Sequence, residues 1–438
     1  MQIPFSHWVR PVPRYTSYPT ALQFGAIAPE TFVEHLRAFD RTAKPLSLYI
    51  HIPFCKTMCL FCGCSVVLNR KPERQATYLH ALQQEIALTA GQFSGKRQVT
   101  QLHLGGGTPT SLSEDELSSL MNTLHQHFVF SPDAEIAIEV DPRTVVADHG
   151  AKLRVLRELG FNRISFGVQD LDPVVQEAVR RRQTREMTVN TFQHARSLGF
   201  SSINIDLIYG LPQQTAASFR HTVSELISLN PDRIALFSYA HVPWLKKHQQ
   251  AIRPEELPSP EEKFQIYVEA RTFFLQHGYT AIGMDHFARK EDSLARAYHE
   301  GRLARNFQGY TVQSAEDSLG FGMTAIGFLQ GAYFQNAKTL EEYQARQGQF
   351  PVFRGVVLAP EDLMRRELIQ SIMCRFRIDT TRFAHLIEAH RPELEQLIRE
   401  GLLTETLQAT PTGELFIRLI ASTFDQYLHA QTGFSSSV

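Results

Sequence analysis

Three cysteines, Cys55, Cys59 and Cys62, stand close together with the spacing C-x3-C-x2-C. Thiolates at this spacing can bind metal from one short loop, and three are one fewer than the four that close a typical iron–sulfur or zinc site. A metal that is left one protein ligand short can bind a substrate at its open position. The pattern therefore predicts a metal centre that takes part in chemistry.

Two kinds of metal site compete for this loop. Cys64 adds a fourth thiol, so that Cys55, Cys59, Cys62 and Cys64 together would suit a structural zinc ion. The spacing of the first three, directly after a strand-like run, favours an iron–sulfur cluster. We take the cluster as the prediction and zinc as its alternative.

Further polar and glycine residues follow the other strand-like runs. Gly105–Gly107 follow the second run, Glu139 ends the third, Gln169 the fourth and Asp206 the fifth. The carboxyl ends of parallel strands meet at one edge of a sheet, where such enzymes place their chemistry. These residues and the cysteine loop are therefore expected to share one active-site face.

Each of these residue types suits a ligand and also has a simpler explanation. Gly105–Gly107 let the backbone approach a ligand closely, or make a tight turn. Glu139 and Asp206 can each accept two ribose hydroxyls, or cap the next helix. Arg181 suits a carboxylate, although Arg180–Arg182 can also form a solvated helix face.

Seven strand-like runs, separated by amphipathic segments, must position these residues. The runs begin near Ser47, Val99, Glu135, Arg163, Ser202, Arg233 and Thr280. Apolar side chains recur every three to four residues between them, as they do in helices. The alternation predicts an α/β fold, a partial (β/α)6-type TIM-like barrel with parallel strands, and an open doubly wound sheet is the alternative.

We predict three parts along the chain: an N-terminal arm at 1–44 that lies across the main domain, a barrel at 45–340 and a small, mostly helical cap at 341–438. The cap shows helices and a short hairpin-like run at 407–417, an order known from winged-helix modules. It has no basic face, so nucleic-acid binding is not expected.

The composition indicates an ordinary globular protein. The chain has 438 residues, 43% of them hydrophobic, and a formal net charge of −1, which gives no general attraction to nucleic acid or to a membrane surface. Its first ten residues lack the apolar core of a secretory signal, and no run reaches the length of a membrane span. Clustered free thiols without an export signal predict a cytoplasmic location.

Several segments resemble the radical S-adenosylmethionine (SAM) superfamily, whose signature is this cysteine spacing with an aromatic residue, here Phe61, before the last cysteine. Within it the chain is similar to the oxygen-independent coproporphyrinogen III oxidases, from RYTSYPT near the N-terminus to the C-terminal helices. The segments that carry this likeness are YIHIPFCKTMCLFCGC, HLGGGTPTSL, IEVDPRT, RISFGVQD, NIDLIYGLP, YAHVP, GMDHFA and NFQGYT.

The resemblance implies one 4Fe-4S cluster, held by Cys55, Cys59 and Cys62, and two SAM molecules. The residues implied around the SAM on the cluster are Tyr49, Gly106, Glu139 and Ile326. Those implied around the second SAM are Phe61, Gly107, Thr108, Gln169, Arg181, Asp206 and Ala240. Cys64 is implied to act near the second SAM, or in proton or electron handling, without binding the cluster.

The implied activity is that of an oxidoreductase of heme and porphyrin biosynthesis. A SAM-derived 5′-deoxyadenosyl radical removes hydrogen from a propionate of coproporphyrinogen III, and loss of CO2 leaves a vinyl group. Two rounds, on rings A and B, give protoporphyrinogen IX. The implied partners are an electron donor such as a flavodoxin-type reductant and an unidentified electron acceptor, and the expected state is a monomer.

Arg14 and Arg305 are our candidates for binding the substrate's carboxylates, with the arm closing over the tetrapyrrole. Two alternative functions keep the same motifs. One is a heme-binding or heme-trafficking protein that retains the cluster, and the other is a radical enzyme that acts on another tetrapyrrole.

Overall fold

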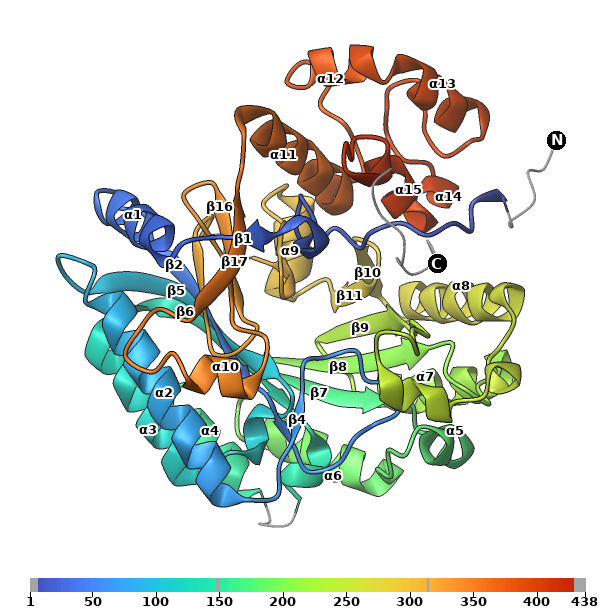
Figure 1. Cartoon of the computed structure of the whole chain (residues 1–438). Helices are drawn as coiled ribbons and strands as arrows, with labels where there is room; N and C mark the ends of the chain where they lie inside the picture. Colours follow the sequence, from blue (N-terminus) through green and yellow to red (C-terminus); the bar gives the residue numbers. More distant parts are fainter. Residues whose placement is uncertain (1–6, 147–149, 313–314, 429–438) are drawn as a thin grey trace.

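Six parallel strands, each followed by helix, form the centre of the protein (Figure 1). The structure is a computed structural model that describes residues 7–146, 150–312 and 315–428. The parallel strands are β2 (Leu46–Ile52), β5 (Arg97–Gly106), β6 (Phe128–Val140), β7 (Arg163–Gln169), β8 (Ser202–Tyr209) and β9 (Arg233–Ser238). The helices that follow them are α2 (Pro72–Ala90), α3 (Glu114–His127), α4 (Ala151–Glu158), α5 (Pro173–Ala178), α6 (Arg185–Ser197), α7 (Ala216–Ser228) and α8 (Pro260–Gln276).

This order confirms the predicted α/β fold with a partial barrel. All seven predicted strands are present, and the first six run parallel. The seventh, β10 (Tyr279–Ile282), pairs antiparallel with β11 (His286–Arg289), which pairs antiparallel with β9. The parallel series ends in this hairpin because the short connection between β10 and β11 cannot make a parallel crossover.

Helices cover the outside of the curved sheet, and their apolar faces are the predicted ones. Figure 1 shows α2, α3 and α4 outside the curve. Their buried residues include Tyr78, Leu79, Leu82, Ile86, Leu117, Leu120, Met121 and Leu124. Each such side chain contributes about 1.5–3 kcal/mol when it is fully buried. The strand β2 is buried along nearly its whole length, as expected of a parallel strand that is covered on both faces.

An antiparallel extension of the sheet was not predicted. It consists of β14 (Ser318–Phe321), β15 (Ile326–Leu329), β16 (Ala332–Asn336) and β17 (Val352–Val357), joined by β1 (Gly25–Ala26). Only β14 runs parallel to its neighbour β2. Because β1 belongs to the predicted arm and β17 to the predicted cap, both parts contribute to the main sheet, and the division into domains stays a prediction. The shorter elements are α1 (Pro29–Asp40), α9 (Ser293–His299), α10 (Leu340–Gln344), β12 (Ala304–Asn306) and β13 (Gly309–Thr311).

The C-terminal part is helical, and its hairpin-like run is largely helix. The helices are α11 (Pro360–Arg375), α12 (Ala384–Ala389), α13 (Arg391–Arg399), α14 (Pro411–Leu415) and α15 (Ile417–Ser422). The predicted hairpin at 407–417 is wrong over most of its length, because Thr410 caps α14 by accepting a hydrogen bond from the Gly413 N–H at 3.0 Å. Proline at the first helical position favours the same start.

The N-terminal arm lies against the C-terminal helices and the hairpin β12–β13, as Figure 1 shows for its course beside α15. The Tyr15 hydroxyl donates to Asp425 at 3.1 Å, and Arg418 donates to the Val12 carbonyl at 3.2 Å. Arg305, which is 6% exposed, donates from Nη1 to the carbonyls of Arg14 and Tyr15, both at 2.7 Å. Arg14 forms an ion pair with Asp285. Both arginines proposed for the substrate thus already have partners within the protein.

We expect Arg305→Ala to loosen the arm, because it removes the donor from two carbonyl groups at a buried position. The expected loss is about 2–4 kcal/mol in the free energy of unfolding, with faster protease cleavage before residue 20. Chemical denaturation and limited proteolysis measure both effects. Arg302→Ala is the control, since Arg302 is exposed and pairs with exposed Glu300. An arm that stays protease-resistant in the Arg305 variant would contradict this role.

Candidate active site

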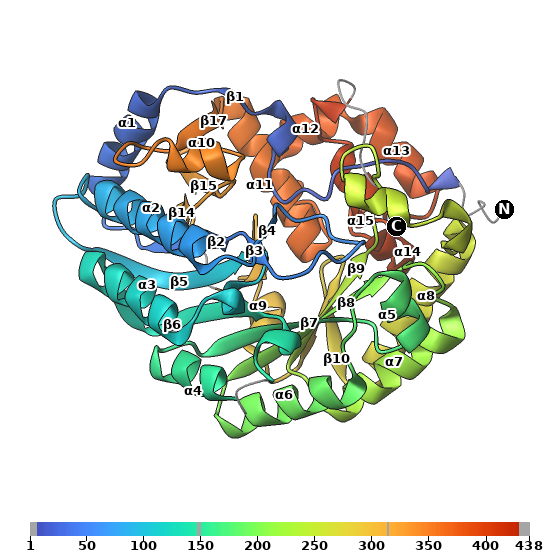
Figure 2. The ribbon, with the colours of Figure 1, turned by 60° about the horizontal axis from the view of Figure 1, so that its bottom comes forward.

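The cysteine loop lies over the carboxyl ends of the parallel strands. Figure 2 shows β3 (Phe54–Cys55) and β4 (Val67–Leu68) near the middle of the ring of strands and helices. The two short strands pair in parallel, and the loop between them carries the other cysteines. The Val67 N–H donates to the Pro53 carbonyl at 2.8 Å, and the Asn69 N–H donates to the Cys55 carbonyl at 3.0 Å. Both ends of the loop are therefore fixed to the end of β2.

A second segment, after β9, holds the middle of the loop by its carbonyl groups. Lys246 donates to the Cys64 carbonyl at 2.9 Å, and His248 Nε2 donates to the Cys62 carbonyl at 2.8 Å. Gln249, which is fully buried, donates to the Phe61 carbonyl at 3.1 Å. Our reading of the sequence missed these three residues, because nothing in their spacing indicates contact with a loop some 180 positions earlier in the chain.

The four thiols of the loop have different surroundings. Burial raises the pKa of Cys55 to about 11, although its Sγ lies 3.3 Å from the Thr108 hydroxyl. Cys59 Sγ accepts hydrogen bonds from Arg143 at 3.7 Å and from Arg181 at 3.6 Å. The Cys64 thiol donates to Cys62 and, with Lys246 and His248 nearby, lowers the pKa of Cys62 to about 6. Cationic neighbours of this kind stabilise the thiolates that bind metal.

The two kinds of metal site that the sequence suggested differ in how many of these thiols they need. Among the described residues no three His, Cys, Asp or Glu side chains converge as a single metal ion requires. Zinc held by Cys55, Cys59, Cys62 and Cys64 would need all four sulfurs around one point. In a 4Fe-4S cluster each cysteine binds a different iron, so the sulfurs stay further apart. Zinc would thus need Cys64 as a fourth ligand, whereas a cluster that leaves one iron open needs only Cys55, Cys59 and Cys62.

Neighbouring protein atoms leave no room for side chains at the three glycines where β5 ends, Gly105–Gly107. A Cβ on Gly107 would lie 2.5 Å from the Pro53 carbonyl oxygen, and one on Gly105 would lie 2.8 Å from Glu139 Oε1. Gly106 has φ +116°, and its Cβ would lie 2.6 Å from the His51 ring. The glycines therefore let the cysteine loop, β5 and Glu139 pack together, a reason that differs from the ligand contact we predicted for them.

Glu139 stands at the centre of the residues predicted for the first SAM. Its carboxylate accepts from the Gly106 N–H at 3.1 Å and lies 3.2 Å from His103 Nε2. Burial acts to raise the pKa of Glu139, but these hydrogen bonds outweigh it and the net pKa is lowered. Protein surrounds this carboxylate, yet 41% of its side-chain surface is accessible, so it faces a cleft inside the protein. A charged acceptor of this kind suits the hydroxyl groups of a ribose.

Tyr49 extends the same cluster. Its ring stacks on that of His103 with centroids 6.0 Å apart. Its hydroxyl lies 3.0 Å from His51 Nδ1, and His51 Nε2 lies 2.9 Å from the Ser65 carbonyl. Since a carbonyl only accepts, Nε2 carries the proton, and burial lowers the pKa of His51, so Nδ1 accepts from Tyr49.

Residues predicted for the second SAM gather around β7 and β8. Asp206 stands in register with Gly167, whose carbonyl accepts from Arg181. Ser165 Oγ donates to Asp206 at 2.9 Å and Asn204 Nδ2 donates at 2.7 Å, yet burial and the nearby charge of Glu139 raise the pKa of Asp206 to about 6. Gln169 Oε1 is buried and has no hydrogen-bond partner within the described part of the chain, which suits a donor group on a ligand.

The arginine triplet is split between two environments. Arg181 is buried and donates to Asp141 at 3.4 Å as well as to Cys59, whereas Arg180 and Arg182 are exposed. Arg181 therefore joins the second group to the cysteine loop, and the solvated-face alternative holds for its neighbours alone. Asp141 also pairs with Arg143 at 2.6 Å. Our prediction omitted this pair, although both residues directly follow β6.

Three predicted residues lie at the edges of the site. The carbonyls of Phe61 and Ala240 both accept from Gln249 Nε2, at 3.1 and 3.3 Å, so one side chain joins them. Ile326, on β15, packs its backbone against Gly320, which stands in register with Tyr49. The structure thus brings the predicted site residues to one face of the sheet, and their roles toward a ligand remain predictions.

Comparisons with known proteins match this architecture. The family model described as the radical SAM superfamily matches residues 49–226. A solved structure of coproporphyrinogen III oxidase from Escherichia coli, described as a radical SAM enzyme, is similar with a TM-score of 0.89 and 43% identity, over 96% of this chain and 100% of that one. The match places this chain among the radical SAM enzymes, which bind a 4Fe-4S cluster and SAM.

Proteins that are similar in sequence show which family of radical SAM enzymes the chain belongs to. Oxygen-independent coproporphyrinogen III oxidase of Escherichia coli is 45% identical over 433 residues, and that of Synechocystis is 42% identical over 435 residues. Each alignment spans 95% of this chain and 93% of the relative. The chain belongs to the family of oxygen-independent coproporphyrinogen III oxidases. Among the described residues, no helix has the length and apolar character that crossing a membrane demands.

We expect Gly107→Ala to reduce cluster loading, because the added Cβ would meet the Pro53 carbonyl and push the cysteine loop away from β5. The strain should cost about 1–3 kcal/mol of stability and lower the iron content after anaerobic reconstitution several-fold. Iron and sulfide analysis with a denaturation curve measures both. Gly95→Ala, just before the same strand, is the control because nothing lies within 4 Å of its Cβ. Equal iron content in the two variants would disprove the close contact.

The raised pKa of Asp206 predicts how the stability of the protein depends on pH. The pKa of Asp206 is raised to about 6 in the folded state, so the folded state binds the extra proton and stability falls as pH rises from about 4 to 6. Asp206→Asn removes this titration, so the free energy of unfolding of the variant relative to the parent should be about 1–2 kcal/mol higher at pH 8 than at pH 4. The expected difference is smaller than the full pKa shift would give, because water reaches part of this group. Urea unfolding at the two pH values tests this. The opposite sign would show that Asp206 is stabilised as a carboxylate.

Proposed function

We propose that this protein converts coproporphyrinogen III to protoporphyrinogen IX without oxygen, by oxidative decarboxylation of two propionates to vinyl groups. The observation that carries the proposal is the placement of the three-thiol loop beside Glu139 and Asp206 on one face of the sheet. Identity of 45% across nearly the whole of a relative named for this activity supports the substrate.

The reaction defines what the site must provide. Each propionate that becomes a vinyl group releases CO2, one proton and two electrons, and the first step breaks an unactivated C–H bond. The cluster and SAM, when bound, supply the carbon radical that this bond requires. The protein's own contribution is to orient the groups and to exclude water.

The residues divide into three roles in this proposal. Cys55, Cys59 and Cys62 would hold the cluster, and Arg143 and Arg181 would offset charge at Cys59. Glu139 and Tyr49, with Gly106 and Ile326, would line the SAM site beside the cluster.

A second SAM would lie between the loop and β8, lined by Phe61, Gly107, Thr108, Gln169, Arg181, Asp206 and Ala240. In this arrangement the buried Gln169 oxygen gains the donor it lacks. Cys64 would face this site. Its thiol is exposed to the cleft and donates to Cys62, and the adjoining thiolate raises its pKa well above the ordinary value, so it would remain a proton donor at neutral pH.

The proposed reaction also needs partners. One electron must enter for each SAM that is cleaved, which requires a low-potential donor such as a flavodoxin-type reductant. Another electron must leave for each propionate, to an acceptor that the chemistry does not identify. We propose that the protein works as a cytoplasmic monomer.

An anaerobic assay tests the function. Reconstituted protein receives SAM, dithionite, a cell-extract acceptor and coproporphyrinogen III, and the products are read by mass and fluorescence. We expect loss of two CO2 per substrate, abolished in Cys62→Ala because one iron loses its ligand. Cys374→Ala is the matched control, since Cys374 is a buried thiol of α11 far along the chain from the loop.

Two other outcomes would redirect the proposal. Cleavage of SAM without loss of CO2 would keep the radical chemistry and move the substrate to another tetrapyrrole. Stable heme binding without SAM cleavage would favour a heme-binding or heme-trafficking role.

A further inference from the structure

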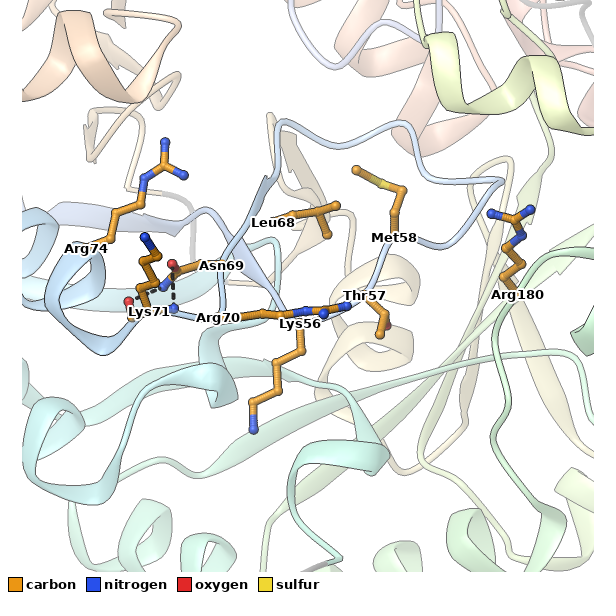
Figure 3. Close-up of a pocket in the computed structure, with 9 residues that line it drawn as sticks. All are labelled: Lys56, Thr57, Met58, Leu68, Asn69, Arg70, Lys71, Arg74 and Arg180. Carbon is orange, nitrogen blue, oxygen red and sulfur yellow. Dashed lines mark hydrogen bonds between the residues drawn. The ribbon is translucent and has the colours of Figure 1, made fainter.

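A basic hollow lies against the outer side of the cysteine loop. Its volume is about 680 Å³. The residues that line it, which we call the basic rim, are Lys56, Thr57, Met58, Leu68, Asn69, Arg70, Lys71, Arg74 and Arg180. Figure 3 shows Lys56, Thr57 and Met58 on one arm of the loop, and Arg180 on the facing side. The other arm supplies Leu68, Asn69, Arg70 and Lys71, and the first turn of α2 supplies Arg74. Five of the nine residues are cationic and none is acidic.

The charges of the basic rim are largely unbalanced. Within the described residues, the side chains of Lys56, Arg70, Lys71 and Arg180 make no hydrogen bond or ion pair, and all four residues are exposed. Arg74 pairs with Glu341 at 3.1 Å, and Arg180 lies close enough to Glu177 to help Arg182 lower the pKa of that carboxylate. In a chain whose net charge is −1, this concentration of positive charge is a local feature. A surface field of this kind attracts an anionic partner and speeds its association.

An apolar centre accompanies the charges. Leu68 is 50% exposed, and Met58 beside it is half-buried. Protein interfaces commonly join an apolar centre to a polar or charged rim. A small anion would gain nothing from exposed leucine, whereas a protein partner would.

The basic rim is also fixed firmly to the metal-binding loop. Lys56, Thr57 and Met58 lie between Cys55 and Cys59. The buried Asn69 side chain accepts from the Lys71 N–H at 3.1 Å and donates to its carbonyl at 2.9 Å (Figure 3). The Asn69 N–H donates to the Cys55 carbonyl. A partner seated here would therefore lie against the loop that carries the cysteines, and a short path between partner and metal site favours electron transfer.

We propose that the basic rim is the docking surface for an acidic protein that delivers one electron at a time to the cluster. The proposal rests on the proposed function, because it gives a place to the donor that SAM cleavage needs. In each encounter the donor loses one electron and the cluster gains it. Complexes between redox proteins are small and transient, which suits a limited, charged surface of this kind.

The substrate's carboxylates are the competing occupant. None of the residues that line the basic rim belongs to the group around Glu139 and Asp206. If the four carboxylates of coproporphyrinogen III bound at the basic rim, the substrate would lie outside the cysteine loop and away from the predicted SAM sites. We therefore assign the rim to the protein donor and leave the substrate as an outcome of the test.

The test compares charge reversals at two places. The rim variant carries Arg70→Glu, Lys71→Glu and Arg180→Glu. The control variant carries Lys290→Glu, Arg375→Glu and Arg399→Glu, three exposed cations outside the rim. The probes are an acidic flavodoxin and an acidic 2Fe-2S ferredoxin. Their binding to each protein, with the cluster loaded, is measured by biolayer interferometry at low and high salt.

We expect the rim variant to associate with at least one probe about tenfold or more slowly at low salt, with the difference shrinking at high salt as charges are screened. The control variant should bind like the parent. Association equal to the parent's with both probes, or no binding by the parent itself, would overturn the proposal.

Dithionite-driven turnover separates this proposal from the function on which it rests. If the rim serves a protein donor, the rim variant should decarboxylate normally with dithionite and slowly with reduced flavodoxin or ferredoxin. A loss with dithionite as well, accompanied by a raised KM for coproporphyrinogen III, would assign the rim to the substrate and reject the donor site. Absence of decarboxylation in the parent would refute the proposed function, while the binding measurement would still decide the docking surface.

Discussion

The contact between Gly107 and the Pro53 carbonyl sets the position of the cysteine loop. No side chain fits between them, so β5 can approach the end of β2 only with glycine at this point. The Gly107 N–H donates to the Ile52 carbonyl at 2.8 Å, and the adjoining Gly106 donates to Glu139. One close approach therefore fixes the three thiols and a carboxylate relative to each other. A cofactor and a substrate that react with each other must be held at a set distance, and this contact sets the distance between the groups that would bind them.

The thiols and carboxylates of the site have different charged neighbours, and their pKa values differ accordingly. Asp141 lies between Arg143 and Arg181, and the same two arginines donate to Cys59. Asp141 therefore holds both arginines in place. Because two cations face one carboxylate, positive charge remains beside Cys59. Burial, with the charge of Glu139 added, raises the pKa of Asp206 despite its hydrogen bonds from Ser165 and Asn204, whereas the contacts of Glu139 with His103 and Gly106 outweigh burial and lower its pKa.

The open barrel needs other parts of the chain to cover its ends. The antiparallel strands β14–β17 continue the sheet beyond β2, and the β10–β11 hairpin continues it beyond β9. The arm then joins the C-terminal helices through Tyr15 and Asp425, and Arg305 secures its backbone. Arg14 pairs with Asp285 and Arg305 donates to the backbone of the arm, and the closing of the arm over the tetrapyrrole stays a prediction.

The sequence by itself determined the six parallel strands, the helices between them and the residue types at the strand ends, because buried strands and amphipathic helices have periods that a single chain displays. It also determined the cysteine loop, whose ligands are local. Only the tertiary structure decided that Gln249 and His248 hold that loop, that Arg181 is buried while Arg180 is exposed, and that β10 turns back as a hairpin. These features depend on contacts between distant segments and on connection lengths, and local patterns carry no information about which distant partner a polar side chain will meet.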